Sequence, residues 1–136
     1  MPELLDLEVA TPERQLVHEA VAEVQIPAKN GYMGVLPGHA PLLGELGTGF
    51  LSYSAGGKKR YLSVQGGLVE VLPDHVRVLA NIAERAEEID VERAKADLRR
   101  AQEQIGNPAV GVDPAVSLDE WAWAQARVDA AENEQK

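Results

Sequence analysis

Residues 75–101 read HVRVLANIAERAEEIDVERAKADLRRA, and this stretch decides the fold because the spacing of its apolar residues changes within it. Up to about Asn81, apolar and polar residues alternate, which is the period of a β-strand with one buried face. From Ile89 onward the apolar residues recur every three or four positions, which is the period of an amphipathic helix. The sequence therefore predicts a β half followed by a helical half.

The part before this switch is a series of short alternating runs separated by turn residues. We expect strands at residues 5–9, 17–26, 49–55, 60–64, 68–71 and 75–80. Gly56 and Gly57 supply the positive φ values that a tight hairpin needs, and Pro73 leads the turn of a second hairpin. Gly66 and Gly67 separate two of the runs. No long helical pattern lies between the runs, so we expect an antiparallel β-sandwich or flattened barrel.

The part after the switch predicts two helices. The apolar stripe of the first helix is Val91, Ala94, Leu98, Ala101 and Ile105. Asp90 is placed to cap its first turn, and the Gly-Asn-Pro sequence at residues 106–108 ends it. A capping-box pattern at Ser117 predicts that the second helix starts there, after a connector over residues 106–116.

The two halves also set the expected domain organisation. We expect a sandwich domain over residues 1–86 and a helical hairpin over residues 87–136. Two helices are too small to bury a core of their own, so the hairpin must pack on the sheet or on a partner, and it is the natural moving part. We expect Arg93 and Asp97 to pair along the first helix and the polar residues 132–136 to fray.

The composition excludes several classes of function. The chain has 136 residues, a formal net charge of −9 and no cysteine. The acidic excess disfavours binding to nucleic-acid phosphates, and without thiols there is no disulfide, zinc-thiolate site or thiol nucleophile. No apolar run approaches the ~18 residues that span a bilayer, and no signal sequence begins the chain. We therefore expect a cytoplasmic protein with no nucleic-acid partner.

The sequence contains no recognisable catalytic or metal site. His18 and Glu19 begin the zinc pattern of metalloproteases, but Ala22 stands where the second histidine is required. His75 lies at a predicted turn beside Asp74, as a surface residue would. Neither a Walker-type phosphate loop nor a nucleophile elbow is present. We expect no catalytic residue and no bound metal.

One loop carries more information than the rest. Residues 31–43 read GYMGVLPGHAPLL, and glycines and prolines spaced this closely fix a particular backbone path. Two interpretations are open, internal scaffolding of the sandwich or a rigid loop presented to another protein.

This loop resembles the signature of the epsilon subunit of F-type ATP synthases, the bacterial counterpart of the mitochondrial delta subunit. Residues 5–9, 61–71, 76–80 and 89–94 match the same family in the same order. The resemblance implies a β-sandwich followed by a helical hairpin, with no catalytic site of its own and no required cofactor. It also implies a rotor subunit in the central stalk, which binds the gamma subunit and rests on the membrane c-subunit ring.

The resemblance places the partner contacts on the same loop. The positions that it assigns to contacts with the ring or with gamma are Gly31, Tyr32, Met33, Gly34 and His39. Tyr32 departs from the family pattern, in which an acidic residue is frequent at this position. In bacterial members the helices can also extend toward the alpha and beta subunits and restrain ATP hydrolysis.

Some family members bind regulatory ATP in the folded hairpin. The Ile-Asp-x-x-Arg-Ala motif of that site matches Ile89, Asp90, Arg93 and Ala94. Glu84 falls at the adenine contact, and Arg100 and Arg127 could meet phosphates, because a guanidinium suits a polyphosphate. Trp123 stands where the family has a further arginine, so we expect weak binding. The alternative is that Arg93 and Arg100 are solvated helix charges.

The expected function is therefore a subunit of the proton-translocating ATP synthase that couples the catalytic head to the c ring and restrains hydrolysis. It would lie peripherally on the cytoplasmic face of the bacterial inner membrane. The alternative is a stand-alone β-sandwich ligand-binding module with a helical oligomerisation tail. Scattered aromatic residues do not favour a carbohydrate platform, and three histidines without a cluster do not favour a cupin-like enzyme.

Overall fold

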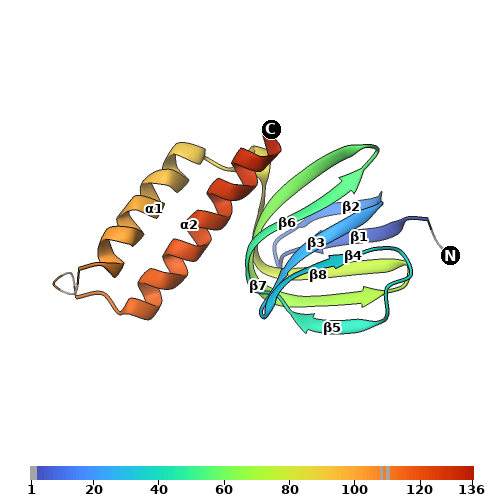
Figure 1. Cartoon of the computed structure of the whole chain (residues 1–136), viewed down its shortest axis with the longest axis horizontal. Coiled ribbons are helices and arrows are strands. Elements are labelled where there is room, and N and C mark those ends of the chain that lie inside the picture. The colour runs from blue at the N-terminus through green and yellow to red at the C-terminus, as the bar shows by residue number, and fades with distance from the viewer. Residues whose placement is uncertain (1–2, 108, 110) are drawn as a thin grey trace.

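The computed structural model describes residues 3–107, 109 and 111–136, and it shows a β-sandwich beside which two helices lie next to each other (Figure 1). The strands are β1 (Leu5–Ala10), β2 (Gln15–Val21), β3 (Glu23–Ala28), β4 (Gly31–Val35), β5 (Leu42–Glu45), β6 (Thr48–Ala55), β7 (Lys58–Leu72) and β8 (His75–Arg85). A 3-10 turn, η1 (Ala86–Glu88), leads to α1 (Val91–Ile105) and α2 (Pro114–Glu134). The expected fold class is confirmed.

The long strand β7 belongs to both layers of the sandwich. Among the described residues the sheet order is β2-β1-β8-β7-β6-β3-β4, and β5 pairs with β7 as well. Residues 58–65 of β7 pair with β6, whereas residues 68–71 pair with β5. The change of partner falls at Gly66 and Gly67, whose φ angles are +67° and +122°. Glycine adopts such angles readily, so the sheet can fold over on itself here.

The sandwich core follows from the alternation seen in the sequence. In β1 the side chains of Leu5, Leu7 and Val9 are fully buried, while those between them reach the surface. The same alternation runs through β7 and β8 and builds one apolar cluster between the layers. The two predicted hairpins are also present, because Ala55 pairs with Lys58 and Leu72 pairs with His75.

Four details of the β half differ from the prediction. Residues 31–43, which were expected as a loop, contain β4 and the first residues of β5. The run at residues 17–26 forms two strands, because β2 pairs with β1 and β3 pairs with β6, so the chain changes layer at Ala22. Gly66 and Gly67 lie inside β7 instead of between two strands. The pair β1/β8 is parallel within an otherwise antiparallel sheet. Alternation reports which face is buried, and it carries no information on pairing partners or direction.

The ends of the helices confirm some predictions and correct others. Asp90 caps α1, its carboxylate accepting from the Arg93 N–H at 3.1 Å, and α1 ends at Ile105; Pro108 lies outside the described residues. The start predicted at Ser117 is wrong, because Asp113 caps α2 by accepting from the Ala115 N–H at 2.9 Å. Proline at the first helical position favours this earlier start.

The helix α2 lies between α1 and the sheet, so it buries side chains on two sides. Its buried residues are Ser117, Ala124, Ala126, Val128, Ala130 and Ala131. Leu118 and Ile105, which were expected in the hairpin seam, are 52% and 42% exposed. Within the stretch expected to fray, α2 is helical through Glu134, which accepts hydrogen bonds from β7. The ion pair expected between Arg93 and Asp97 is replaced by Arg100 to Asp97 at 2.6 Å.

Gly67→Ala tests the fold at the corner of β7. A Cβ at Gly67 would collide with the carbonyl oxygen of Leu79, and the backbone φ is unfavourable for alanine. We expect a loss of about 3 kcal/mol or more in the free energy of unfolding, measured by urea denaturation. Gly57→Ala is the matched control, since its φ is also positive but nothing lies within 4 Å. Equal losses in the two variants would contradict this account of the corner.

Candidate functional site: the helix docking face and two surface regions

The outer face of β6 and β7 forms a docking face for α2. It carries Phe50 and Ser52 from β6, opposite Ser63 and Tyr61 from β7. Phe50 and Tyr61 pack in one cluster with Val128 and neighbouring residues of the helices, with their ring centroids 5.8 Å apart. The inward neighbours of these residues belong to the sandwich core. The docking face therefore has its own apolar cluster, separate from that core.

The contact between α2 and the docking face leaves some buried hydroxyl groups without a hydrogen bond. Ser52 and Ser63 are buried, and their hydroxyls have no hydrogen-bond partner among the described residues; the same is true of Ser117 on α2. A buried hydroxyl without a partner costs about 1–3 kcal/mol. The residues that α2 itself buries are mostly alanines, each of which buries little area. The helical hairpin is therefore held less firmly than the strands.

A polar cluster joins both helices to the sheet. Arg127 of α2 is only 14% exposed, and its Nε donates to Oε1 of Glu84 at 2.7 Å. Its Nη1 lies 3.8 Å from Asp97 of α1, which also accepts from Arg100. The structure thus brings together three of the residues expected at a nucleotide site, Glu84, Arg100 and Arg127. Asp97, which links Arg100 to Arg127, was expected only as a partner of Arg93.

The other residues of the expected nucleotide site have different surroundings. Ile89 and Ala94 are buried in the apolar cluster with Val128, so their side chains pack the hairpin. Arg93 is exposed, and Asp90 is engaged as the helix cap. A hollow of about 300 Å³ lies between the helices, lined by Asp97, Arg100, Gln104, Glu120, Trp123 and Ala124. Its lining offers one guanidinium and two carboxylates.

Four of the five expected partner-contact residues lie within β4, and His39 lies beyond its end. Gly31 begins the strand, and Tyr32 folds back onto β6, where its hydroxyl accepts from the Phe50 N–H at 3.1 Å. Gly49 makes room for this, because a Cβ there would lie 2.5 Å from the Tyr32 hydroxyl oxygen. Met33 packs against the core, and Gly34 has open space around it.

His39 lies beyond the other end of β4, so the structure does not bring it together with Gly31. Its Nδ1 donates to the carbonyl oxygen of Ala40 at 2.7 Å. The neighbouring Gly38 N–H donates to the carbonyl oxygen of Pro73 at 2.7 Å, which ties the loop to the turn between β7 and β8. The loop is therefore a fixed part of the scaffold that also reaches the surface.

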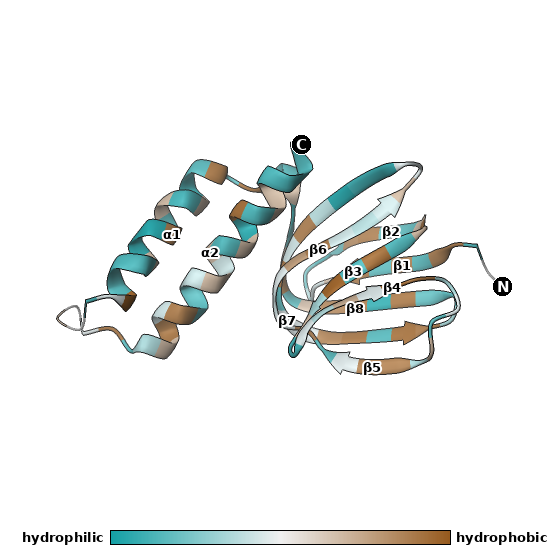
Figure 2. Ribbon diagram, in the orientation of Figure 1, coloured by the Kyte–Doolittle hydropathy of each residue, from teal (hydrophilic) through white to brown (hydrophobic). Residues whose placement is uncertain are grey.

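A cluster of exposed leucines is the surface feature that the sequence analysis missed. Leu43, Leu68 and Leu79, here called the leucine patch, are 71%, 50% and 49% exposed on β5, β7 and β8. Figure 2 shows hydrophobic residues along these strands, away from the helices. The patch borders a hollow of about 740 Å³ whose lining includes Met33 and residues 28–30. Apolar residues in a strand look alike whether they face the core or the surface, which is why the patch was missed.

The link between sandwich and hairpin is fixed by a charged cluster. The Nη1 and Nη2 atoms of Arg14 donate to the carboxylate of Glu88 at 2.7 and 2.8 Å, and the Arg85 N–H donates to it at 3.0 Å. These interactions, with the hydrogen bond from Arg14 the largest, hold the pKa of Glu88 at about 2. The start of the helical half is thereby anchored to Arg14, the residue before β2.

Two searches of the described residues bear on the class of function. None of their helices is long and apolar enough to cross a membrane. No group of three or more histidine, aspartate or glutamate side chains in the described part of the chain could hold a metal ion.

Comparison with protein families and known sequences gives consistent matches. Residues 4–86 match the model of the β-sandwich domain of the ATP synthase delta/epsilon chain. The ATP synthase epsilon chain of Solibacter usitatus is 64% identical over 132 residues, which cover 97% of this chain and 98% of that one. The ATP synthase epsilon chain of Koribacter versatilis is 47% identical over 105 residues, which cover 77% and 74% of the two chains.

Solved structures are similar as well. A chain in the Euglena gracilis mitochondrial ATP synthase structure of OSCP, F1 and c-ring superposes with a TM-score of 0.77 and 28% identity. The match covers all of this chain and 84% of that one. A chain of the central stalk and c-ring of the Tetrahymena thermophila mitochondrial ATP synthase has a TM-score of 0.52 over 63% and 69% of the two chains. At 12% identity, the second match shows the fold alone.

Glu88→Gln tests the charged cluster at the link. The pKa of Glu88 is lowered from its ordinary value of 4.5 to about 2, so the interaction stabilises the fold above pH 4.5. That contribution is lost as the pH falls from 4.5 toward 2. We expect Glu88→Gln to lower stability at neutral pH and to flatten its dependence between these pH values, measured by urea midpoints. Glu87→Gln is the control, and equal slopes in the two variants would contradict the assignment.

Proposed function

The chain belongs to the ATP synthase epsilon-chain family, and from that premise we propose that its sandwich couples the catalytic head to the membrane c ring while its helices restrain ATP hydrolysis. In this proposal residues 1–86 are the coupling domain and residues 87–136 are the moving part. The subunit has no catalytic residue of its own, and it lies peripherally on the cytoplasmic face of the bacterial inner membrane.

The leucine patch is the observation that supports the coupling role. The three leucines lie on adjacent strands and are each about half exposed or more, so their contact with water is unfavourable in free energy. Contiguous apolar surface of this kind marks a protein contact. Glu70 and Arg77 line a hollow together with the three leucines, and they would supply polar contacts at the edge of the patch. We assign the patch to the gamma subunit and the β3–β4 turn with Tyr32 to the c ring.

The docking face is the observation that supports the regulatory role. Because buried serine hydroxyls and alanines make the contact weak, a small free energy separates the docked hairpin from a released one. A released hairpin would expose Phe50 and Tyr61 on the sandwich and its own apolar seam, which could then contact the alpha and beta subunits.

Removal of residues 89–136 tests both roles in the assembled complex. The gamma subunit and the c ring should co-purify with the shortened chain as with the full chain, because the leucine patch is retained. The rate of ATP hydrolysis should rise severalfold if the helices restrain it. Complex lacking the chain altogether is the control. Loss of gamma would contradict the assigned contact, and an unchanged rate would contradict the regulatory role.

Regulatory ATP binding is the second part of the proposal, and the polar cluster sets its strength. A triphosphate could gain Arg127 only by displacing Glu84 and Asp97, and Trp123 occupies the wall of the adjoining hollow. Arg100 is 63% exposed and has a single carboxylate partner to exchange. We therefore propose weak binding with Arg100 as the first phosphate contact.

Titration calorimetry of the purified chain with ATP checks this. Weak binding heat is expected for the unmodified chain and a smaller heat for Arg100→Gln. Arg99→Gln is the matched control, because Arg99 is exposed on the same helix and carries the same charge. Absence of heat at millimolar ATP, or equal losses in the two variants, would reject the site.

A further inference from the structure

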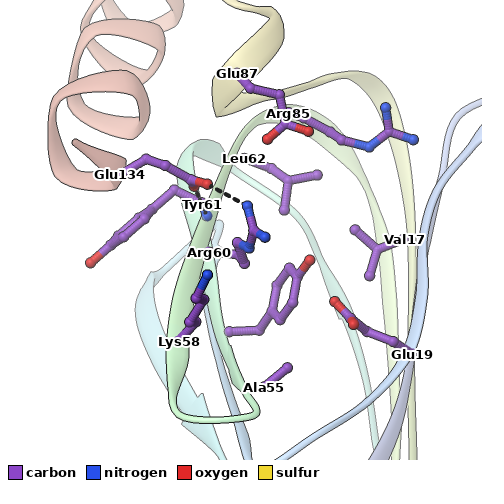
Figure 3. A pocket seen from close by; sticks show the side chains of 11 residues that line it. Val17, Glu19, Ala55, Lys58, Arg60, Tyr61, Leu62, Arg85, Glu87 and Glu134 are labelled. Carbon is purple, nitrogen blue, oxygen red and sulfur yellow. Dashed lines mark hydrogen bonds and ion pairs between the residues drawn. The ribbon is translucent and has the colours of Figure 1, made fainter.

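A small cavity lies where the end of α2 meets the open edge of β7 (Figure 3). The ladder between β7 and β8 ends at the pair Leu62 and Arg85, after which the chain leaves the sheet as η1. Within the described part of the chain, residues 58–61 of β7 therefore have no neighbouring strand on that side. A backbone N–H on such a free edge needs another acceptor when it is covered.

Glu134 supplies that acceptor from the last turn of α2. Its Oε2 accepts from the Tyr61 N–H at 2.7 Å, and its Oε1 accepts from Nη1 of Arg60 at 3.2 Å. The Glu134 side chain is only 18% exposed, whereas Arg60 is 48% exposed. The same hydrogen bond raises the pKa of the Arg60 guanidinium. The carboxylate thus sits between a backbone donor and a fixed cation.

The charged residues that line the cavity suit it to binding one carboxylate. Lys58, Arg60 and Arg85 are the cations of its lining, and Glu19 and Glu87 are the acidic groups besides Glu134. Burial is the main cause that raises the pKa of Tyr53, which also lines this cavity. Figure 3 shows the carboxylate of Glu134 turned toward Arg60. With Glu134 withdrawn, the lining would hold three cations against two carboxylates.

We propose that the Arg60 guanidinium and the Tyr61 N–H form a carboxylate-binding site whose ligand is the chain's own Glu134, and that its occupancy sets the fraction of helical hairpins docked on the sandwich. The site lies within the contact that already leaves Ser52 and Ser63 without partners. Apart from the ion pair of Arg127 with Glu84, the residues that α2 buries are mostly alanines, so one charge-assisted hydrogen bond to a backbone donor can shift the equilibrium. The regulatory meaning of this site rests on the proposed function, while the site itself does not.

Hydrogen exchange of the purified full chain tests the site. In Glu134→Gln and Glu134→Ala, the Tyr61 amide should exchange about ten- to hundredfold faster, the range expected for loss of a hydrogen bond to a charged group. The amides of α2 from residue 124 to residue 131 should lose protection by a similar factor. Glutamine should have the smaller effect, because its side-chain oxygen can still accept from the Tyr61 N–H.

Glu132→Gln is the matched control, because Glu132 lies on the same turn, is 50% exposed and pairs with Lys95. Its exchange rates should equal those of the unmodified chain. Protection of the core strands β1 and β8 reports that each variant is folded. Unchanged protection of Tyr61 and α2 in both Glu134 variants, or an equal effect of Glu132→Gln, would overturn the proposal. This outcome is independent of the hydrolysis assay, which tests the function alone.

Discussion

The bend of β7 at Gly66 and Gly67 is the constraint on which the rest of the structure depends. Before the bend, β7 pairs with β6 and builds the face on which α2 docks; after it, β7 pairs with β5 and carries Leu68 of the leucine patch. One strand therefore supports both surfaces to which we assign a function. A residue with a Cβ at Gly67 would meet the backbone of β8, so the two surfaces depend on the same small residue.

The two apolar clusters of the molecule differ in the side chains that they bury, and the proposed regulatory role depends on this difference. The sandwich core consists of leucines, valines and isoleucine on alternating strand positions, nearly all fully buried. The smaller helical cluster buries three alanines, one valine and one isoleucine, with two aromatic rings, a valine and a leucine partly buried against them, near buried serine hydroxyls. Polar contacts by Arg127 and Glu134 hold its two ends. A hairpin attached in this way can leave while the sandwich remains folded.

Much of the fold was predictable, and the pairing errors in the β half share one cause. Alternation located the strands other than β4 and β5, and Asp90 marked the start of α1, because both signals depend on neighbouring residues only. The split at Ala22 and the parallel pairing of β1 with β8 depend on which strands meet across the sandwich. Two errors in the helical half are local instead: α2 begins after Asp113, and Asp97 pairs with Arg100 three positions later where Arg93 was expected.

The sequence by itself determined the order of β half and helical half, the hairpins at Gly56 and Pro73, and the family, because these follow from local periodicity, turn chemistry and a continuous motif. Only the tertiary structure decided which apolar residues stay exposed and where the charges of the helices go. Three features join residues between 11 and 73 positions apart in the sequence. They are the leucine patch, the ion pair of Glu84 with Arg127 and the hydrogen bond from β7 to Glu134. Contacts at such separations arise from chain folding and leave no periodic signal in the sequence.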